Sequence, residues 1–257
     1  MYISKFYGMD GKEYVVSDSI STEQIAEIKE AYSHIYQFLN ETDHYITVFE
    51  NTQEFFGILN NRNYEEETKF IHINRCFTNY LNAFYTWRCF HNHIDSWYLS
   101  EQFNTFKVHY QENNLVYRLA NSLRNYTTHN GFAISKITYD VLKAKTYYWI
   151  SPQFYEHKYT KANLKKTYLD EVKVRGIDAY SFTLDFVNMF NEMQMEYWKM
   201  IKDEICKELE ILSKFAATTT PDCYNTYIIN SCDDEFHLNI GRILELYSKR
   251  MKFLQLK

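Results

Sequence analysis

The sequence has few of the residues that build tight turns. Among its 257 residues are 6 glycines and 2 prolines, against a usual combined share of roughly 12%. A fold with many tight turns needs these residues at its corners, so their scarcity disfavours such folds and favours long helices. The 24 tyrosines, 19 phenylalanines and 4 tryptophans supply many large side chains for a core, which excludes disorder over most of the chain.

Disulfide frameworks, zinc knuckles and membrane spans are also missing from the pattern. The five cysteines are odd in number and contain no Cys-x-x-Cys pair: Cys76, Cys89, Cys206, Cys223 and Cys232. We therefore expect reduced thiols and a cytoplasmic location. The first residues lack the apolar run of a signal peptide, and no stretch of about 18 apolar residues is present to cross a bilayer. No membrane partner is expected.

The charge balance disfavours broad coating of nucleic acid. The formal net charge is -5 at pH 7, so the surface as a whole does not attract phosphate groups. A nucleic-acid partner must therefore be held by a local basic site. The candidates for contacts with RNA are Lys158, Lys161, Lys165 and Lys166. These lysines could steer an RNA backbone, although a solvated helix face is the commoner explanation of such a cluster.

The hydrophobic pattern begins with a hairpin signal and a helix. Asp10-Gly11 between two alternating runs predicts a β-hairpin near residues 1–17. Ser21 and Gln24 form a capping-box pattern. Apolar residues then recur at helical spacing: Ile25, Ile28, Tyr32, Ile35 and Leu39. We expect a hairpin-like segment over residues 1–20 and a single helical domain over residues 21–257, because no linker rich in proline, glycine or serine divides the chain.

Helical periodicity also occurs in the rest of the chain. It covers residues 70–94, residues 103–126 with a break near 112–114, residues 164–215, and the tail from Glu235. Residues 134–151 instead alternate and are rich in β-branched side chains, which predicts two strands or an insertion. The expected fold class is therefore mainly α: a helical bundle of five or more helices, with small β-hairpin decorations near 1–17 and 134–151.

One helical pattern ends in residues that suit phosphate chemistry. The stretch LRNYTTHNG places Arg124 five residues before His129. Residues at that spacing lie about 140° apart on an ideal helix, so the two side chains share a face only if the helix distorts. The two threonines between them favour helices weakly, and the Asn-Gly that follows is a good C-terminal cap. We therefore predict that the helix unwinds beyond Tyr126 and brings His129 toward Arg124.

Arginine and histidine together can act on RNA. Histidine can take a proton from a ribose 2′-hydroxyl or return one to the leaving oxygen, and arginine stabilises charge on the phosphate oxygens. The amide of Asn125 could orient the phosphate or the imidazole. This chemistry requires no metal and no other cofactor. The plainer alternative is a surface helix end at which Arg124 and His129 complement the helix dipole.

These residues resemble the R-x-x-x-x-H signature of the HEPN superfamily, including the polar residue directly after the arginine. The segment INRCFTNYLNAFYTW, followed by a helix ending in LRNYTTHNGF, also resembles the two central helices of bacterial HEPN proteins, so the resemblance covers about Ile71 to Phe132. It implies a HEPN-like bundle that forms a homodimer with two motifs facing one another. It also implies a metal-independent endoribonuclease with catalytic Arg124 and His129, supported by Asn125, that leaves a cyclic phosphate.

The resemblance also bears on partners. Family members act largely in toxin–antitoxin, abortive-infection and other antiviral systems. No nucleotidyltransferase motif is present, so an antitoxin or a defence-complex protein would be a separate chain. Toxins that are silenced by tyrosine nucleotidylation carry a tyrosine two residues after the histidine, whereas Gly131 stands there in this sequence, so that regulation is not expected.

Some polar residues outside the motif are secondary candidates. Arg75, on the polar flank of the helix before the motif, and Tyr126 could support the site. His91 and His93 are two residues apart, so on a helix they point to different sides. No metal ligand is therefore expected.

Three hypotheses follow from the sequence. The first is a homodimeric endoribonuclease that cleaves RNA by attack of the 2′-hydroxyl. The second is a HEPN-like domain without catalysis that binds a nucleotide, RNA or a partner protein. The third is a structural subunit of a larger defence complex. Cleavage of RNA in the presence of a chelator separates the first from the other two.

Overall fold

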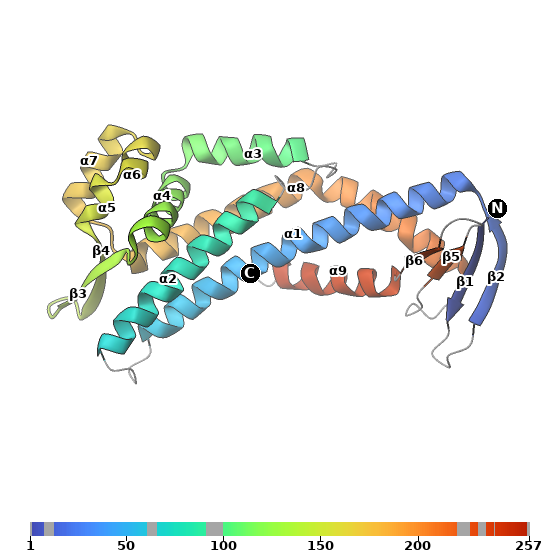
Figure 1. The fold of residues 1–257 in the computed structure, drawn as a ribbon, viewed down its shortest axis with the longest axis horizontal. Coiled ribbons are helices and arrows are strands. Elements are labelled where there is room, and N and C mark those ends of the chain that lie inside the picture. The colour runs from blue at the N-terminus through green and yellow to red at the C-terminus, as the bar shows by residue number, and fades with distance from the viewer. Residues whose placement is uncertain are drawn as a thin grey trace. The chain divides into compact units, whose positions relative to one another are not determined.

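The computed structural model describes residues 2–7, 13–60, 66–90, 100–219, 227–230, 235–238 and 240–255. Within them the chain is mainly helical, as the sequence predicted (Figure 1). The chain forms two compact units, one of Met1–Thr42 with Met200–Lys257 and one of Asp43–Lys199. The boundary falls inside two long helices, α1 (Thr22–Asn60) and α8 (Ala179–Thr219). The predicted division into residues 1–20 and 21–257 stays a prediction.

The 43–199 unit contains most of the shorter elements. Its further helices are α2 (Glu66–Cys89), α3 (Ser100–Asn113), α4 (Leu115–Asn130), α5 (Pro152–Glu156), α6 (Lys158–Asn163) and α7 (Lys166–Arg175). Strands β3 (Ile134–Asp140) and β4 (Lys145–Ile150) pair antiparallel between α4 and α5, which confirms the hairpin expected at 134–151. Helix α2 ends at Cys89, and the predicted continuation to residue 94 lies outside the described residues.

The other unit combines a small sheet with helices. Its strands are β1 (Tyr2–Tyr7), β2 (Glu13–Ile20), β5 (Tyr227–Asn230) and β6 (Glu235–Leu238), in the antiparallel order β2-β1-β5-β6, and they precede α9 (Ile240–Gln255). The N-terminal hairpin is therefore confirmed. The helix predicted from Glu235 is wrong at its start, because residues 235–238 pair with β5. A short apolar run fits a strand as well as a helix, and pairing with another strand decides between them.

Helix α1 begins as the capping-box pattern predicted. The backbone N–H of Ser21 donates to Gln24 Oε1 at 3.0 Å, and the N–H of Gln24 donates to Ser21 Oγ at 3.2 Å. Two free donors at the helix N-terminus are satisfied in this way. The predicted apolar stripe is buried at Ile25, Ile28, Ile35 and Leu39.

The core of the 43–199 unit is built from aromatic side chains. Phe84 of α2 packs edge-to-face against Phe186 and Phe190 of α8, with ring centroids 5.2 and 5.6 Å apart. Trp87 meets Phe190 at 4.9 Å and Phe103 of α3 at 5.3 Å. Aromatic pairs of this geometry contribute beyond the area that they bury. The core thus fixes α2, α3 and α8, the frame on which α4 lies.

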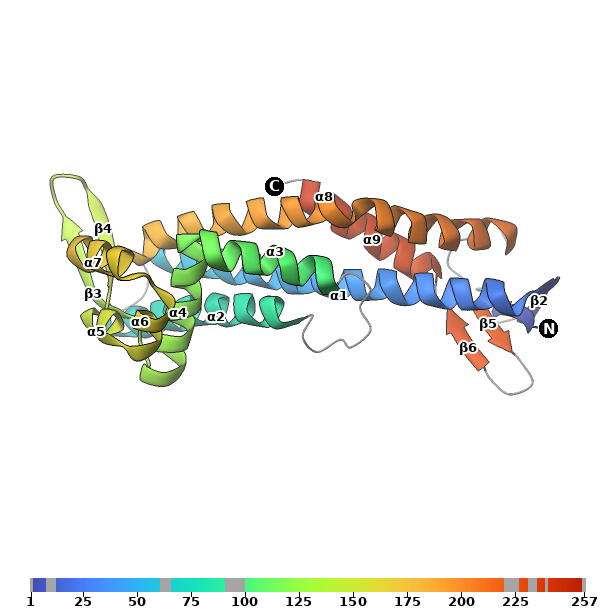
Figure 2. The same ribbon diagram turned by 90° about the horizontal axis from the view of Figure 1, so that it is seen from above.

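A buried asparagine attaches the hairpin to α2. The N–H of Ile134 donates to Asn74 Oδ1 at 2.9 Å, and Asn74 Nδ2 donates to the Ile134 carbonyl oxygen at 3.1 Å. Asn74 is 1% exposed. Figure 2 shows α5, α6 and α7 gathered beside α4, at the end of the molecule where the β3–β4 hairpin also lies. The chain that follows the motif therefore returns to the same end of α4.

Candidate functional site

Helix α4 carries the motif that the sequence singled out. Asn114 caps its N-terminus, where the Asn114 side chain accepts a hydrogen bond from the backbone N–H of Tyr117 at 3.0 Å. This confirms the break predicted between α3 and α4. The helix then continues through Asn130. The predicted unwinding beyond Tyr126 is therefore wrong.

Local hydrogen bonds explain why the last turn stays helical. The hydroxyls of Thr127 and Thr128 each donate to the Arg124 carbonyl oxygen at 2.9 Å. Such bonds to the preceding turn let threonine remain in a helix despite its weak preference for one. Gly131, with a φ of 89°, ends the helix, and its N–H donates to the Thr127 carbonyl oxygen at 3.3 Å. Arg124 and His129 thus keep the separation of about 140° set by an α-helix.

The Arg124 side chain turns toward α2. Its guanidinium carbon lies 3.7 Å from the centroid of the Tyr85 ring, a cation–π contact. Its Nη1 donates to Asn125 Oδ1 at 3.2 Å. Its Nε is buried and has no hydrogen-bond partner among the described residues. Arg124 is therefore held in place by an aromatic ring and keeps donors that no carboxylate occupies.

His129 faces a different set of residues. It is exposed, and its ring centroid lies 5.5 Å from that of Tyr159. The ring of His157 lies 5.3 Å from the same tyrosine, so two imidazoles share one aromatic neighbour. Asn130 Nδ2 donates to His157 Nε2 at 3.0 Å. Burial lowers the pKa of His157, and the nearby charges of His129 and Lys158 lower it further.

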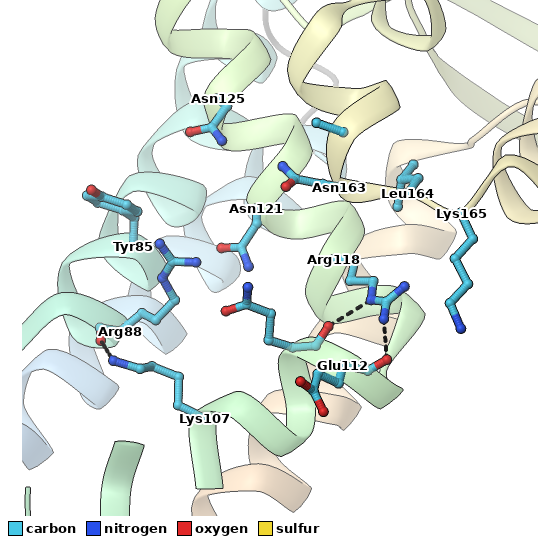
Figure 3. Close-up of a pocket in the computed structure, with 12 residues that line it drawn as sticks. Tyr85, Arg88, Lys107, Glu112, Arg118, Asn121, Asn125, Asn163, Leu164 and Lys165 are labelled. Carbon is cyan, nitrogen blue, oxygen red and sulfur yellow. Dashed lines mark hydrogen bonds between the residues drawn. The ribbon is translucent and has the colours of Figure 1, made fainter. Parts of the chain in front are cut away.

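A polar cavity of about 630 Å³ lies beside α4 (Figure 3). We call it the basic cavity. It is lined by Tyr85 and Arg88 of α2, Lys107, Gln111 and Glu112 of α3, Arg118, Asn121 and Asn125 of α4, and Ala162, Asn163, Leu164 and Lys165 around the α6–α7 connection. It therefore contains four cationic side chains, four amides and one carboxylate.

The cations of the basic cavity are held by carbonyl oxygens and a ring. Arg118 donates through Nε to the Gln111 carbonyl oxygen at 2.7 Å, and also to that of Glu112. Lys107 Nζ donates to the Arg88 carbonyl oxygen at 3.5 Å, and the Arg88 guanidinium lies 5.1 Å from the Tyr85 ring centroid. Among the described residues, Arg88, Arg118 and Lys165 form no ion pair with a carboxylate.

Electrostatics inside the basic cavity reflect this crowding of positive charge. Burial lowers the pKa of Lys107, and the charge of Arg88 lowers it further. Burial also raises the pKa of Tyr117 to about 12, against the opposing effect of Arg88 beside it. The Tyr117 hydroxyl is buried without a hydrogen-bond partner of good geometry. Figure 3 shows Arg88 and Asn121 pointing toward one another across this part of the cavity.

The other predicted site residues are dispersed. Asn125 and Lys165 line the basic cavity. Tyr126 is buried, with its ring edge-to-face against Phe154 and His157 at 5.7 and 5.6 Å, so it joins α4 to α5. Arg75 pairs with Glu54 of α1 at 3.5 Å and lies about 15 Å along α2 from Tyr85, given a rise of 1.5 Å per residue.

The remaining lysines of the predicted cluster differ from one another. Lys161 pairs with Glu156 at 2.8 Å, and with Lys173 it holds the pKa of that carboxyl at about 2. Lys158 lies 5.0 Å from the ring centroid of Tyr159, near His129. Lys166 is exposed at the start of α7. Only Lys165 of this cluster lines the basic cavity.

Sequence reasoning missed several residues of the site. Tyr85 and Arg88 lie one helical turn apart on α2, and Arg118 and Asn121 repeat that spacing on α4. Residues three apart lie on the same face of a helix. The spacing of these polar residues in α2 and in α4 could therefore have indicated two polar faces from the sequence alone. His157 had no such signal, because only the return of the chain through α5 brings it to Asn130.

Two structural absences concern the described residues. No group of three or more His, Cys, Asp or Glu side chains among them is arranged to hold a metal ion. His91 and His93, considered in the sequence, lie outside the part of the chain that the structure describes. No helix in the described ranges combines the length and apolar character needed to cross a membrane.

Comparison with known proteins identifies no relative of this chain. No protein-family model, curated protein or solved structure matches this chain closely enough to indicate kinship. The resemblance of the Ile71 to Phe132 segment to the HEPN superfamily therefore stays a prediction.

Proposed function

We propose that the protein is a metal-independent endoribonuclease that binds RNA at the basic cavity and cleaves it beside the C-terminal turns of α4. In this proposal His129 takes the proton from a ribose 2′-hydroxyl, whose oxygen bonds to the adjacent phosphorus as the P–O5′ bond breaks, and the imidazolium then gives that proton to the leaving 5′-oxygen. Arg124 stabilises the charge on the attacked phosphate. Asn125, which accepts a hydrogen bond from Arg124 at 3.2 Å, orients the guanidinium.

The observation that carries the proposal is the basic cavity. The chain as a whole has a formal net charge of -5, yet four cations and one carboxylate line this cavity. A local surplus of positive charge is what an acidic chain needs to hold a phosphate backbone. The cavity is lined by Asn125 and by Tyr85, the residue that holds Arg124. RNA in the cavity would therefore lie next to the motif.

The geometry of α4 makes a homodimer part of the proposal. Arg124 contacts Tyr85 whereas His129 contacts Tyr159, and an intact helix keeps the two side chains about 140° apart. A site that needs both groups on one phosphate is more easily completed by two copies of α4 than by one. The RNA partner, the homodimer and any separate antitoxin or defence-complex protein belong to this proposal.

One observation favours a second function, the binding of RNA or a nucleotide without cleavage. The basic cavity and Arg124 supply phosphate-binding groups, whereas the exposed imidazole of His129 contacts Tyr159 and is not among the residues that line the cavity. Binding requires only the first set of groups. In both functions the protein binds RNA, but in the second function the RNA is not cleaved and no product forms.

Cleavage of RNA in the presence of a metal chelator tests the first function. We expect wild type to cut single-stranded RNA, and we expect His129→Ala to reduce the rate by roughly 10²- to 10⁴-fold, the usual contribution of a general base. Loss of the charge-stabilising group in Arg124→Ala should cost on the order of 10²-fold or more. Gel analysis should show products that end in a cyclic phosphate.

Matched controls separate loss of chemistry from loss of fold. His109→Ala changes an exposed histidine of α3, and Arg175→Ala changes an exposed arginine of α7; both should cut at the wild-type rate. Equal cutting by wild type, His129→Ala and Arg124→Ala would reject the nuclease. RNA binding without cutting, weakened by Arg124→Ala, would instead establish the second function. The defence role is a proposal that comes from the family resemblance alone.

A further inference from the structure

We propose that the basic cavity recognises a terminal phosphate of RNA, that is, a nucleotide that carries a phosphate monoester, in preference to an internal phosphodiester. The inference takes from the proposed function only that the ligand is RNA. It assigns specificity to Arg88, Arg118 and Lys165, which lie outside the Arg124–His129 motif.

The charge of the cavity fits a monoester better than a diester. Four cations and one carboxylate line it, which leaves a surplus of three positive charges. An internal phosphodiester brings one negative charge, whereas a phosphate monoester brings about 1.5 to 2 at pH 7. A terminal nucleotide followed by one diester therefore comes close to neutralising the surplus.

The cations are placed so that an anion can reach them. Arg118 uses Nε and one terminal nitrogen for carbonyl oxygens at the end of α3, and a guanidinium has five N–H donors. The Arg88 guanidinium lies near Asn121 and the buried Tyr117 hydroxyl. That hydroxyl has no hydrogen-bond partner of good geometry. Lys165 reaches the cavity from an exposed position on the α6–α7 connection.

Mutual repulsion among the cations supports the same conclusion. The pKa of Lys107 is lowered by burial and by the charge of Arg88. Lys107 and Arg88 are held together by the hydrogen bond from Lys107 Nζ to the Arg88 carbonyl oxygen. A bound dianion would offset their repulsion, and a monoanion would offset less of it.

The size and the remaining polar groups fit a nucleotide. A volume of about 630 Å³ lies within the usual range of roughly 300–1,000 Å³ for sites that enclose a small ligand. Four amides line it, from Gln111, Asn121, Asn125 and Asn163. Amides both donate and accept hydrogen bonds, as recognition of an unpaired base edge or a ribose hydroxyl requires.

Binding of three otherwise identical RNAs tests the proposal. The probes are a short, internally labelled single strand with a 5′-phosphate, with a 3′-phosphate, or with hydroxyls at both ends. Fluorescence anisotropy is measured with His129→Ala in chelator, so that the RNA stays intact. We expect one phosphorylated strand to bind about tenfold more tightly than the hydroxyl strand, as one additional charge-assisted contact would give.

Variants locate the effect in the cavity. Lys165→Ala, at an exposed position, and Arg88→Ala should each reduce the preference for the phosphorylated strand to less than threefold, whereas the neighbouring control Lys166→Ala should keep it. Equal affinity for all three strands would overturn the proposal, as would a preference that survives both cavity variants. The nuclease proposal is judged separately, by cutting of hydroxyl-ended RNA: cutting without end preference rejects only the cavity assignment, and end preference without cutting rejects only the nuclease.

Discussion

The contact between Arg124 and Tyr85 determines what the motif residue can do. Its 3.7 Å separation places the guanidinium over the ring face, where the ring quadrupole attracts a cation. Arginine held in this way loses little conformational entropy when it binds phosphate, because its orientation is already fixed. Among the described residues, the exposed His129 has a ring contact with Tyr159 as its support. In the proposed nuclease, the two motif residues are thus unequally prepared for catalysis.

His157 should make the stability of the protein depend on pH. Its pKa is lowered in the folded state by burial, by His129 and by Lys158, and its Nε2 accepts a hydrogen bond from Asn130. Folding therefore favours the neutral ring. The stabilisation is present above the ordinary histidine pKa of about 6.5 and is lost as the pH falls through that value toward the lowered pKa. We expect the melting temperature to fall between about pH 7.5 and pH 5.5, and to fall less in His157→Gln.

The groups around His157 are consistent with a loss of stability as the pH falls. The rings of Tyr126 and Tyr159 pack against it, and the nearest carboxylate in the chain, that of Glu156, is paired with Lys161 and Lys173. Among the described residues, no carboxylate is a cause of a raised pKa at His157. Thermal melts of wild type, His157→Gln and the exposed-site control His109→Gln measure the effect. An identical pH dependence in all three proteins would contradict it.

At the residue scale, the sequence identified the motif but not its surroundings. Arg124, Asn125 and His129 could be read from one short stretch because they are neighbours in the chain. Tyr85, Arg88 and His157 reach them only through the packing of α2 and the return of α5. Local spacing carries no information about such long-range contacts.

At the scale of elements, Asn74 should be a determinant of how the β3–β4 hairpin docks on α2. Its side chain bonds both the N–H and the carbonyl oxygen of Ile134 in a buried position. In Asn74→Ala both backbone groups lose their partner without access to water. We expect the free energy of unfolding to fall by roughly 2–3 kcal/mol, the cost of buried polar groups left unpaired.

Urea denaturation of wild type, Asn74→Ala and Asn79→Ala measures this loss. Asn79 is an exposed asparagine of the same helix, so its replacement should change the free energy of unfolding by no more than about 0.5 kcal/mol. Equal stability of the two alanine variants would show that the contact from α2 does not hold the hairpin.

The boundaries of helices were predicted correctly where side chains close in sequence determine them. The capping box before α1 and the break before α4 both rest on side chains a few residues away. The forecast of unwinding after Tyr126 failed although its reasons were also local, because Thr127 and Thr128 bond back to Arg124 and keep the turn closed. Strand β6 was missed because its partner β5 lies in another part of the sequence. The helix propensity of threonine is only an average, and in this turn the side-chain hydrogen bonds to Arg124 outweigh it.

At the scale of the whole molecule, an acidic chain places four cations and one carboxylate around the basic cavity. With a formal net charge of -5, long-range attraction to RNA is weak, so the proposed RNA binding would depend on the few cations that line the basic cavity. Salt should therefore weaken RNA binding with a shallow slope, because few phosphates are contacted. In the proposed function, selectivity would come from the shape and local charge of the cavity.

The proposed homodimer leads to a complementation experiment. If one cleavage site uses Arg124 of one subunit and His129 of the partner subunit, then Arg124→Ala and His129→Ala are each inactive alone. Mixed in equal amounts with subunit exchange, half of the dimers contain one copy of each. Each such dimer has one intact site of two, so the mixture should regain about a quarter of the wild-type activity by the symmetry of a two-fold dimer.

The control is a mixture of Arg124→Ala with the double variant Arg124→Ala/His129→Ala, which contains no Arg124 and should remain inactive. Exchange between subunits is confirmed by co-purification of a tagged and an untagged copy. Exchange without recovery would mean that both groups must come from the same subunit. That outcome conflicts with the intact helix, which holds them about 140° apart, unless RNA itself distorts the last turn of α4. Recovery of about a quarter of the wild-type activity would instead agree with an intact α4, and would show that Arg124 and His129 of each site come from different subunits.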